Sequence, residues 1–160
     1  MQRVVKVWVT DQVKRLEIKG RVLEIGSYDV NGNLNKELAG CDHVKLDMRA
    51  GPNVDVVASS HVMPFKRDTI DAVVCADTLE HDSAFWTTMK DIKRVLKPHG
   101  AIVLCVPYIG FPLHEHPSDY WRFTKASMLE LLSGCTDIEV KVIDKKKPYI
   151  CEVFGAGRLR

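Results

Sequence analysis

The feature that most constrains the fold of this chain is a series of short apolar runs, most of which end at a glycine or a polar residue. Runs of this kind are typical of strands that are buried on both faces of a parallel sheet. They cover residues 21–25, 43–46, 54–58, 70–76 and 101–106. Segments with apolar residues at helical spacing separate several of them, and this alternation predicts an α/β fold with helices on both faces of the sheet.

Helices are expected beside and between these strands. Three segments carry apolar residues at helical spacing and stop before a glycine or a proline, which are common helix terminators. A fourth follows Thr124, a candidate N-cap. The four predicted helices cover residues 4–18, 33–38, 84–96 and 125–132.

Two further apolar segments, 138–143 and 150–154, flank a turn at 145–148 and predict a closing hairpin. The hairpin adds an antiparallel edge to a mostly parallel sheet. The expected architecture is therefore a three-layer αβα sandwich that forms a single domain over residues 1–160. Its parts are an N-terminal helix at about 4–18, a ligand-binding half at about 21–107, and a loop with the closing strands at about 108–160.

Composition narrows the classes of function. Hydrophobic residues make up 46% of the chain and charged residues 28%, and the net charge is only +2. This balance disfavours a nucleic-acid partner, and the lack of a long apolar run disfavours a membrane span, so a cytoplasmic location is expected. The five cysteines lie at wide spacings without a Cys-x-x-Cys pair, a pattern that predicts mostly buried, reduced thiols.

Candidate ligand-binding residues stand where the predicted strands end, because ligands of open parallel sheets bind outside the carboxyl ends of the strands. Gly26 lets a ligand approach the backbone closely, and Glu24 can accept hydrogen bonds from an ammonium group or from loop amides. Asp47 follows Gly26 by 21 residues, close to the spacing of a ribose-binding acid in a βαβ unit. In the alternative interpretation Glu24 is a helix-facing salt-bridge partner and Asp47 a turn former.

The kind of cofactor follows from what surrounds Gly26. The next glycine is Gly32, so the G-x-G-x-x-G turn that holds a pyrophosphate is absent, as is the Gly-Lys-Ser/Thr end of a phosphate loop. A cofactor that needs one close-approach glycine, a ribose acid and no phosphate cradle fits this pattern. S-adenosylmethionine is such a molecule.

Several motifs in order resemble one known family, the class I methyltransferases, and within it the small methyltransferase-11-like domains. The resemblance covers residues 21 to about 132 and implies a Rossmann-like fold with S-adenosylmethionine as cofactor. Its motifs are 22–27 (Val-Leu-Glu-Ile-Gly-Ser), 45–47 (Lys-Leu-Asp), 52–60, 63–65 (Met-Pro-Phe), 70–74, 77–81 (Asp-Thr-Leu-Glu-His), 94–100 (Arg-Val-Leu-Lys-Pro-His-Gly) and 114–124 (His-Glu-His-Pro-Ser-Asp-Tyr-Trp-Arg-Phe-Thr).

The resemblance also implies a set of cofactor-binding residues. His99 replaces one of two glycines in its motif. Ser59 and Ser60 stand where many relatives carry an acid that contacts the adenine amino group. The Ser59 hydroxyl or a backbone amide is expected to make this contact instead. The implied cofactor residues are Glu24, Gly26, Ser27, Asp47, Met48, Ser59, Ser60, Asp77, Thr78, Leu79 and His81.

Candidate catalytic residues lie in the long loop after the fifth strand. Methyl transfer from a sulfonium needs alignment of the acceptor, and a base only where the acceptor is protonated. The expected catalytic residues are His114, His116 and Tyr108, and the expected acceptor-binding residues are Asp119, Tyr120 and Arg122. In the alternative interpretation the histidines brace the loop and Arg122 pairs with Asp119 or Glu115.

No metal is expected, because His81, Asp82, His114 and His116 follow no recognised ligand spacing. The predicted function is S-adenosylmethionine-dependent methyl transfer to a small-molecule, sugar-like or peptide acceptor by a monomer or homodimer. The alternative is a non-catalytic module that binds S-adenosylmethionine or serves as the partner of another methyltransferase.

Overall fold

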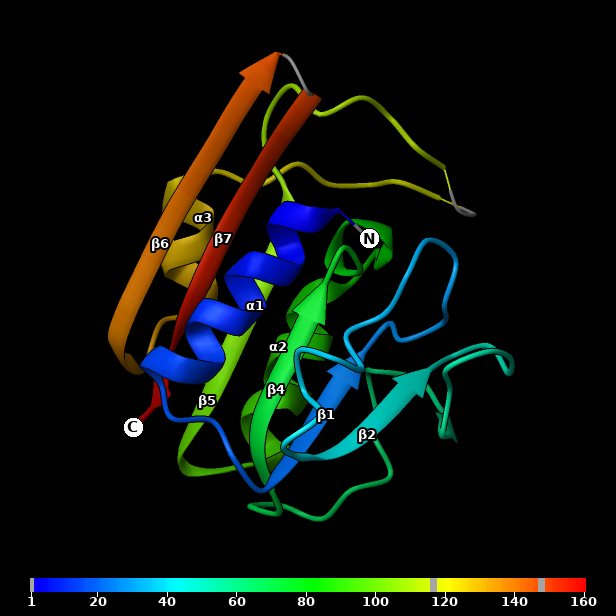
Figure 1. The fold of residues 1–160 in the computed structure, drawn as a ribbon, viewed down its shortest axis with the longest axis vertical. Coiled ribbons are helices and arrows are strands. Elements are labelled where there is room, and N and C mark those ends of the chain that lie inside the picture. The colour runs from blue at the N-terminus through cyan, green and yellow to red at the C-terminus, as the bar shows by residue number, and fades with distance from the viewer. Residues whose placement is uncertain (1, 116–117, 147–148) are drawn as a thin grey trace.

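Seven strands form one sheet in the order β3-β2-β1-β4-β5-β7-β6 in the computed structural model, which describes residues 2–115, 118–146 and 149–160 (Figure 1). The first five strands are parallel, and β7 runs antiparallel to both β5 and β6. Their bounds are β1 (Arg21–Ile25), β2 (Asp42–Asp47), β3 (Val56–Val57), β4 (Ile70–Ala76), β5 (Leu96–Pro107), β6 (Cys135–Lys146) and β7 (Tyr149–Leu159). The mostly parallel sheet with an antiparallel hairpin is confirmed, while part of the expected turn at 145–148 lies outside the described residues.

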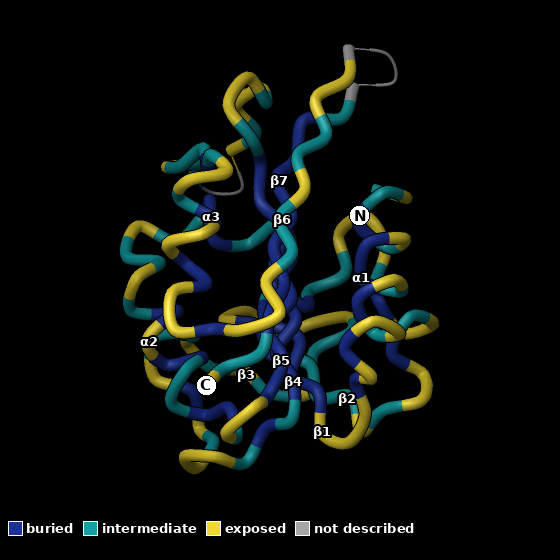
Figure 2. The backbone as a smooth tube through the Cα atoms, turned by 90° about the vertical axis from the view of Figure 1, so that its left-hand side faces the viewer, coloured by how far each residue is buried: buried dark blue, intermediate teal, exposed yellow. Residues whose placement is uncertain are grey.

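Helices lie on both faces of this sheet. Figure 1 shows α1 (Arg3–Arg15) in front of the central strands and α2 (Phe85–Val95) behind them. The edge-on view of Figure 2 places α1 on one side and α2 with α3 (Lys125–Leu131) on the other. A short 3-10 helix, η1 (Leu79–His81), follows β4. The three-layer αβα sandwich is therefore confirmed, and none of the described helices is long and apolar enough to cross a membrane.

The two faces of the sheet bury two separate apolar clusters, because successive strand side chains point to opposite faces. On β1, Val22 packs in the cluster beneath α1, whereas Leu23 and Ile25 pack in the cluster beneath α2 and α3. Thr124 caps α3 as expected, and its side chain accepts a hydrogen bond from the Ser127 N–H at 3.0 Å. Burial on both faces explains why the strands read as continuous apolar runs.

The predicted helix at 33–38 is wrong, since these residues form bends and turns. Local side chains compete with the helical hydrogen bonds there: Asp29 accepts from the Gly32 N–H and the Asn33 amide, each at 2.7 Å. Leu34 and Leu38 are nevertheless fully buried. The apolar spacing was therefore a true signal of burial but not of a helix.

A charged network ties α2 to the loop before β4. Arg94 donates to both carboxylate oxygens of Asp91, at 2.5 and 2.9 Å, and to the carbonyls of Met63 and Phe65 at 2.9 and 2.7 Å. Asp91 also accepts from the Met63 N–H at 2.7 Å. Two of the motifs that carried the family resemblance, 63–65 and 94–100, thus hold each other in place.

The sheet order reverses direction between β1 and β4. β2 and β3 lie beyond β1 on one side of the sheet, and β5, β7 and β6 lie beyond β4 on the other. Such a reversal leaves a crevice outside the carboxyl ends of the two central strands. The predicted site residues that follow β1 and β4 therefore lie at the point where a ligand is expected.

Candidate functional site

A cleft of about 980 Å³ lies at the carboxyl ends of the central strands. Its volume falls at the upper end of the range for small-molecule and cofactor sites. All of the expected cofactor residues except Leu79 line it: Glu24, Gly26, Ser27, Asp47, Met48, Ser59, Ser60, Asp77, Thr78 and His81. Leu79 is fully buried and packs in the core beneath α2 and α3.

Two features of the structure require a glycine at position 26: the conformation of its backbone and the closeness of the Thr78 side chain. Its φ is +77°, a left-handed conformation that side chains disfavour, and a Cβ added there would lie 2.0 Å from the Thr78 hydroxyl oxygen. That hydroxyl lies 3.0 Å from the Ala76 carbonyl and 3.3 Å from the Ile25 carbonyl. Thr78 therefore joins the ends of β1 and β4 through the space that a larger residue at position 26 would need.

Asp47 closes β2 with both carboxylate oxygens facing backbone amides. One oxygen accepts from the Arg49 N–H at 2.9 Å and the other from the Tyr28 N–H at 3.2 Å. A carboxylate has about four lone-pair positions, so two remain for hydroxyl donors. The nearby Ser27 side chain is buried, and its hydroxyl has no hydrogen-bond partner within the described residues. Both groups can therefore bind a ligand.

Glu24 lines the cleft and is already paired. Its carboxylate lies 2.8 Å from the Nε2 atom of His43 on the neighbouring strand β2. This partner belongs to a strand, whereas the alternative interpretation expected Glu24 to face a helix. The other wall of the cleft holds exposed Met48 and the two serines; the Ser59 hydroxyl accepts from the His61 N–H, and the Ser60 hydroxyl lies 2.8 Å from that of Thr88.

The opposite end of the cleft is acidic. Asp77, Glu80 and Glu152 line it, with exposed fractions of 0% for Glu80 and 1% for Glu152. Burial, and then the charge of Glu80, raises the pKa of Asp77 to about 7. Burial, and then the charges of Asp77 and Glu80, raises the pKa of Glu152 to about 9. At neutral pH Glu152 therefore keeps its proton.

Sequence reasoning missed Glu80 and Glu152. Glu80 stands in the Leu-Glu-His motif, but only its two neighbours were assigned to the site. Glu152 interrupts the apolar segment 150–154, and an acid at the centre of a buried strand is a signal that was available. Glu80 and Glu152 lie far apart in the sequence. The pairing of β7 with β5 sets Glu152 opposite Pro107 and so brings it to the same end of the cleft as Glu80.

The loop after β5 brings some of its predicted residues to the cleft. His114 and Tyr120 line the cleft, whereas Tyr108 does not, and its backbone N–H donates to the Cys151 carbonyl at 2.9 Å. His116 lies outside the described residues. Glu80 has the largest effect on the pKa of His114 and raises it. Burial lowers this pKa and the charge of Asp119 raises it, so the pKa of His114 is raised overall.

Arg122 and Asp119 bind each other, as in the alternative interpretation. The guanidinium donates to both Asp119 carboxylate oxygens, at 2.5 and 2.7 Å, and also to the carbonyls of Phe111 and Pro112 at 2.9 and 2.7 Å. The hydrogen bonds from Arg122 to the carboxylate, and then the one from the His114 N–H, hold the pKa of Asp119 far below its usual range. Neither residue lines the cleft, so the geometry favours bracing of the loop over a direct grip on an acceptor.

The sheet order, the cleft at the strand reversal and the acid that ends β2 define a Rossmann-like ligand-binding domain. A family model described as a methyltransferase domain matches residues 20–104, more than half of the chain. The chain therefore belongs to the methyltransferase domain family. No curated protein matches its sequence.

Solved structures of methyltransferases share this fold. The 1,6-didemethyltoxoflavin-N1-methyltransferase of Burkholderia thailandensis, with bound 1,6-didemethyltoxoflavin and S-adenosylhomocysteine, is similar with a TM-score of 0.79 at 15% identity, over 98% of this chain and 78% of that one. A SAM-dependent methyltransferase from Aquifex aeolicus gives a TM-score of 0.68 at 15% identity, over 98% and 92% of the two chains.

A third similar structure is larger than this chain. Phosphoethanolamine N-methyltransferase 2 of Haemonchus contortus, in complex with phosphomonomethylethanolamine and S-adenosylhomocysteine, gives a TM-score of 0.71 at 15% identity, over 94% of this chain and 52% of that one. At such identities the likeness establishes the fold, which agrees with the predicted Rossmann-like architecture.

Proposed function

We propose that this chain binds S-adenosylmethionine in the cleft and transfers its methyl group to a small acceptor that enters at the acidic end. The observation that carries the proposal is the continuity of the cleft, which joins Asp47 and Ser27 at one end to Glu80 and His114 at the other. Family membership supports it, and so do the similar structures that hold S-adenosylhomocysteine beside a small acceptor.

The residues at the β1 and β2 ends fit the chemical groups of the cofactor. Ser27 has a buried hydroxyl free to donate to the cofactor's carboxylate, and Asp47 has spare lone pairs for the two ribose hydroxyls. Met48, whose side chain is exposed at the cleft, offers an apolar surface to the adenine. When bound, S-adenosylmethionine supplies a methyl group activated by its sulfonium.

The acceptor is proposed to be a small molecule, a sugar-like group or a peptide side chain. Methyl displacement needs chiefly the alignment of the accepting atom with the sulfonium, and His114 and Tyr120, which line the cleft, would make that alignment. His114 can accept a proton only above its raised pKa. Asp119 and Arg122 would act by holding the His114 loop.

Calorimetric titration with S-adenosylhomocysteine tests the cofactor site. Asp47→Ala removes an acceptor of charge-assisted hydrogen bonds, each of which contributes about 1.5–3 kcal/mol, so the affinity is expected to fall by at least tenfold. The matched control is Asp55→Ala, an acid that pairs with Lys45 at 3.4 Å and does not line the cleft. Absence of saturable binding, or equal losses in the two variants, would contradict the assignment.

Turnover separates the enzyme from the non-catalytic alternative. The enzyme is expected to form S-adenosylhomocysteine when it is incubated with S-adenosylmethionine and fractions of a small-molecule extract, and Asp47→Ala is expected to abolish that product. Tight cofactor binding with no product from any fraction would support the non-catalytic module.

A further inference from the structure

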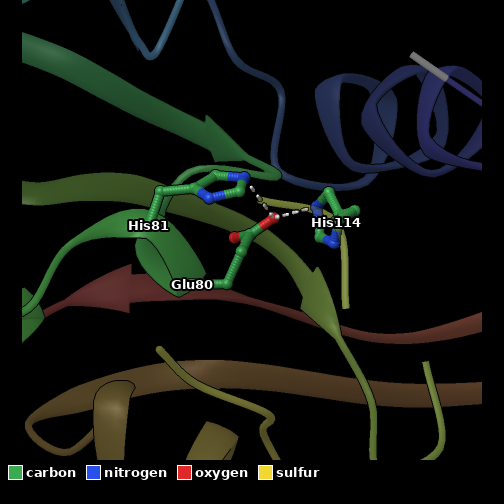
Figure 3. A group of neighbouring side chains, drawn as sticks. All are labelled: Glu80, His81 and His114. Atoms are coloured by element: carbon green, nitrogen blue, oxygen red, sulfur yellow. Dashed lines mark ion pairs between the residues drawn. The ribbon is translucent and has the colours of Figure 1, made fainter. Parts of the chain in front are cut away.

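Three side chains at the acidic end of the cleft converge on one point. We name Glu80, His81 and His114 the Glu-His-His cluster; the first two come from η1 and the third from the loop after β5 (Figure 3). The Oε1 atom of Glu80 lies 3.7 Å from the Nε2 atoms of both His81 and His114. A ligand atom from each residue lies within 4.8 Å of those from the other two.

The side-chain carboxylate of Glu80 is buried without a hydrogen bond. Its exposed fraction is 0%, and neither carboxylate oxygen has a hydrogen-bond partner in the described part of the chain. The 3.7 Å separations from the two histidines are too long for hydrogen bonds. A buried carboxylate in this state is strongly destabilising unless a cation compensates it.

The outer nitrogen of each histidine ring faces an oxygen atom, although only that of His81 makes a hydrogen bond. The Nδ1 atom of His81 lies 2.6 Å from the Ser118 carbonyl, which can only accept, so in the neutral ring this nitrogen carries the proton and the Nε2 lone pair is directed toward Glu80. The Nδ1 atom of His114 lies 3.1 Å from the Asp119 carboxylate, which Arg122 fixes. Metal-binding histidines are oriented in this way by a carbonyl or carboxylate on the outer nitrogen.

We propose that the Glu-His-His cluster binds a divalent first-row transition metal ion, such as Zn²⁺, Fe²⁺, Co²⁺ or Ni²⁺. Bonds of about 2.0–2.2 Å at tetrahedral angles place ligand atoms about 3.3 Å apart. The two separations of 3.7 Å between Glu80 and the histidines need a contraction of only a few tenths of an ångström, and the histidine nitrogens, which lie within 4.8 Å of each other, need a larger one at most. Two imidazoles and one carboxylate suit these ions better than Mg²⁺ or Ca²⁺, which prefer oxygen ligands.

The remaining coordination positions of the ion would face the cleft, because all three ligands line it. A water molecule or an acceptor oxygen can occupy such an open position. The sequence alone did not indicate this site, since His114 lies 33 residues beyond His81 and matches no metal-ligand spacing. The inference does not depend on methyl transfer, because metal binding is measurable without cofactor or acceptor. With a metal ion on its Nε2 atom, His114 would be a ligand and would not also accept a proton there.

Titration of metal-free protein with Zn²⁺ tests the proposal. The protein is freed of metal with EDTA, dialysed, and followed by calorimetry and, with Co²⁺, by visible absorption. We expect one ion per chain, and affinity at least tenfold weaker for Glu80→Gln and His114→Gln. The matched control is His61→Gln, which also lines the cleft but pairs with Asp82 at 2.8 Å outside the cluster; its affinity should stay within twofold.

Thermal unfolding provides a second readout, because the order of the melting temperatures of the wild type and Glu80→Gln should reverse when Zn²⁺ is added. Without metal, Glu80→Gln is expected to melt higher than the wild type, because it removes a fully buried carboxylate that makes no hydrogen bond. Zn²⁺ is expected to raise the melting temperature of the wild type but not that of Glu80→Gln. If a variant does not fold, the wild-type stoichiometry and Co²⁺ spectrum decide. No saturable binding, a spectrum typical of hexaaquo-Co²⁺, or equal affinities in all folded proteins would overturn the proposal.

Discussion

Replacing Gly26 by alanine tests why the first loop needs a glycine. From the sequence, Gly26 is expected to let a ligand approach the backbone. The structure adds a second reason, because a Cβ at this position would lie 2.0 Å from the Thr78 hydroxyl oxygen and 2.8 Å from the Thr78 methyl carbon. The first reason predicts a loss of cofactor affinity alone, and the second predicts a loss of stability in the protein without cofactor.

The expected loss of stability has two parts. The φ of +77° is a left-handed conformation, which costs an alanine about 1–2 kcal/mol. Overpacking against Thr78 costs about 1–3 kcal/mol more. Gly26→Ala is therefore expected to lower the free energy of unfolding by about 2–5 kcal/mol. Thr78→Ala alone loses the hydroxyl contacts with the Ile25 and Ala76 carbonyls, worth about 0.5–1.5 kcal/mol.

Urea unfolding of the wild type, both single variants and the double variant measures the coupling. Thr78→Ala removes the two atoms nearest to the added Cβ and leaves the Thr78 Cβ at 3.0 Å. Gly26→Ala should then cost about 1–3 kcal/mol less in the Thr78→Ala background, while the conformational part persists. Additivity within about 0.5 kcal/mol, or an unchanged unfolding free energy in Gly26→Ala, would refute the steric explanation.

Three further predictions concern titrating groups. Because the folded pKa of Glu152, about 9, lies above its unfolded value, the unfolding free energy should fall as pH rises from about 4 to about 9, and Glu152→Gln should flatten this dependence in urea unfolding at several pH values; equal slopes would contradict it. Burial raises the pKa of Asp91, but hydrogen bonds led by Arg94 outweigh it and lower the pKa overall. Asp91→Asn should therefore cost about 1–3 kcal/mol at neutral pH, with the difference shrinking below about pH 4, as thermal melts in acid would show; a constant difference would exclude the ion pair as its cause. Burial raises the pKa of the Cys75 and Cys105 thiols, so iodoacetamide should label them only after unfolding, and mass spectrometry of native protein labelled at either one would contradict this.

Much of the fold was predictable because burial on both faces leaves a strong trace in the sequence. The run at 70–76 became β4 with the same bounds, Ile70–Ala76, and the run at 21–25 became β1, Arg21–Ile25. The failed helix at 33–38 shows the limit of this signal. Apolar spacing reports which side chains are buried, whereas Asp29 and Asn33 decide by local hydrogen bonds whether the backbone is helical.

The candidate site was predictable where it depends on strand ends and not where it depends on strand pairing. Gly26 directly follows the last residue of β1, and Asp47 is the last residue of β2, so their place in the cleft could be inferred from the sequence spacing. Glu152 comes to the cleft only because β7 inserts between β5 and β6, which no local pattern specifies. The sequence left open whether Arg122 binds the acceptor or pairs with Asp119. The two residues are three positions apart in a loop, and such a spacing does not fix where a side chain points.

The charge balance of the acidic end connects the two proposals. Glu80 and Glu152 are fully buried and Asp77 is half-buried, so the three carboxylates cannot all be ionised in one small space. Raised pKa values of about 7 for Asp77 and about 9 for Glu152 let protons neutralise much of their charge. Glu80 is the carboxylate toward which both imidazoles turn at 3.7 Å, and a metal ion there would neutralise it. If Zn²⁺ does not bind, an amine is the acceptor to test first, because it can pair with these carboxylates as a cation and accept the methyl group once its nitrogen has lost a proton. The metal titration therefore also directs the choice of acceptors to be tested for methyl transfer.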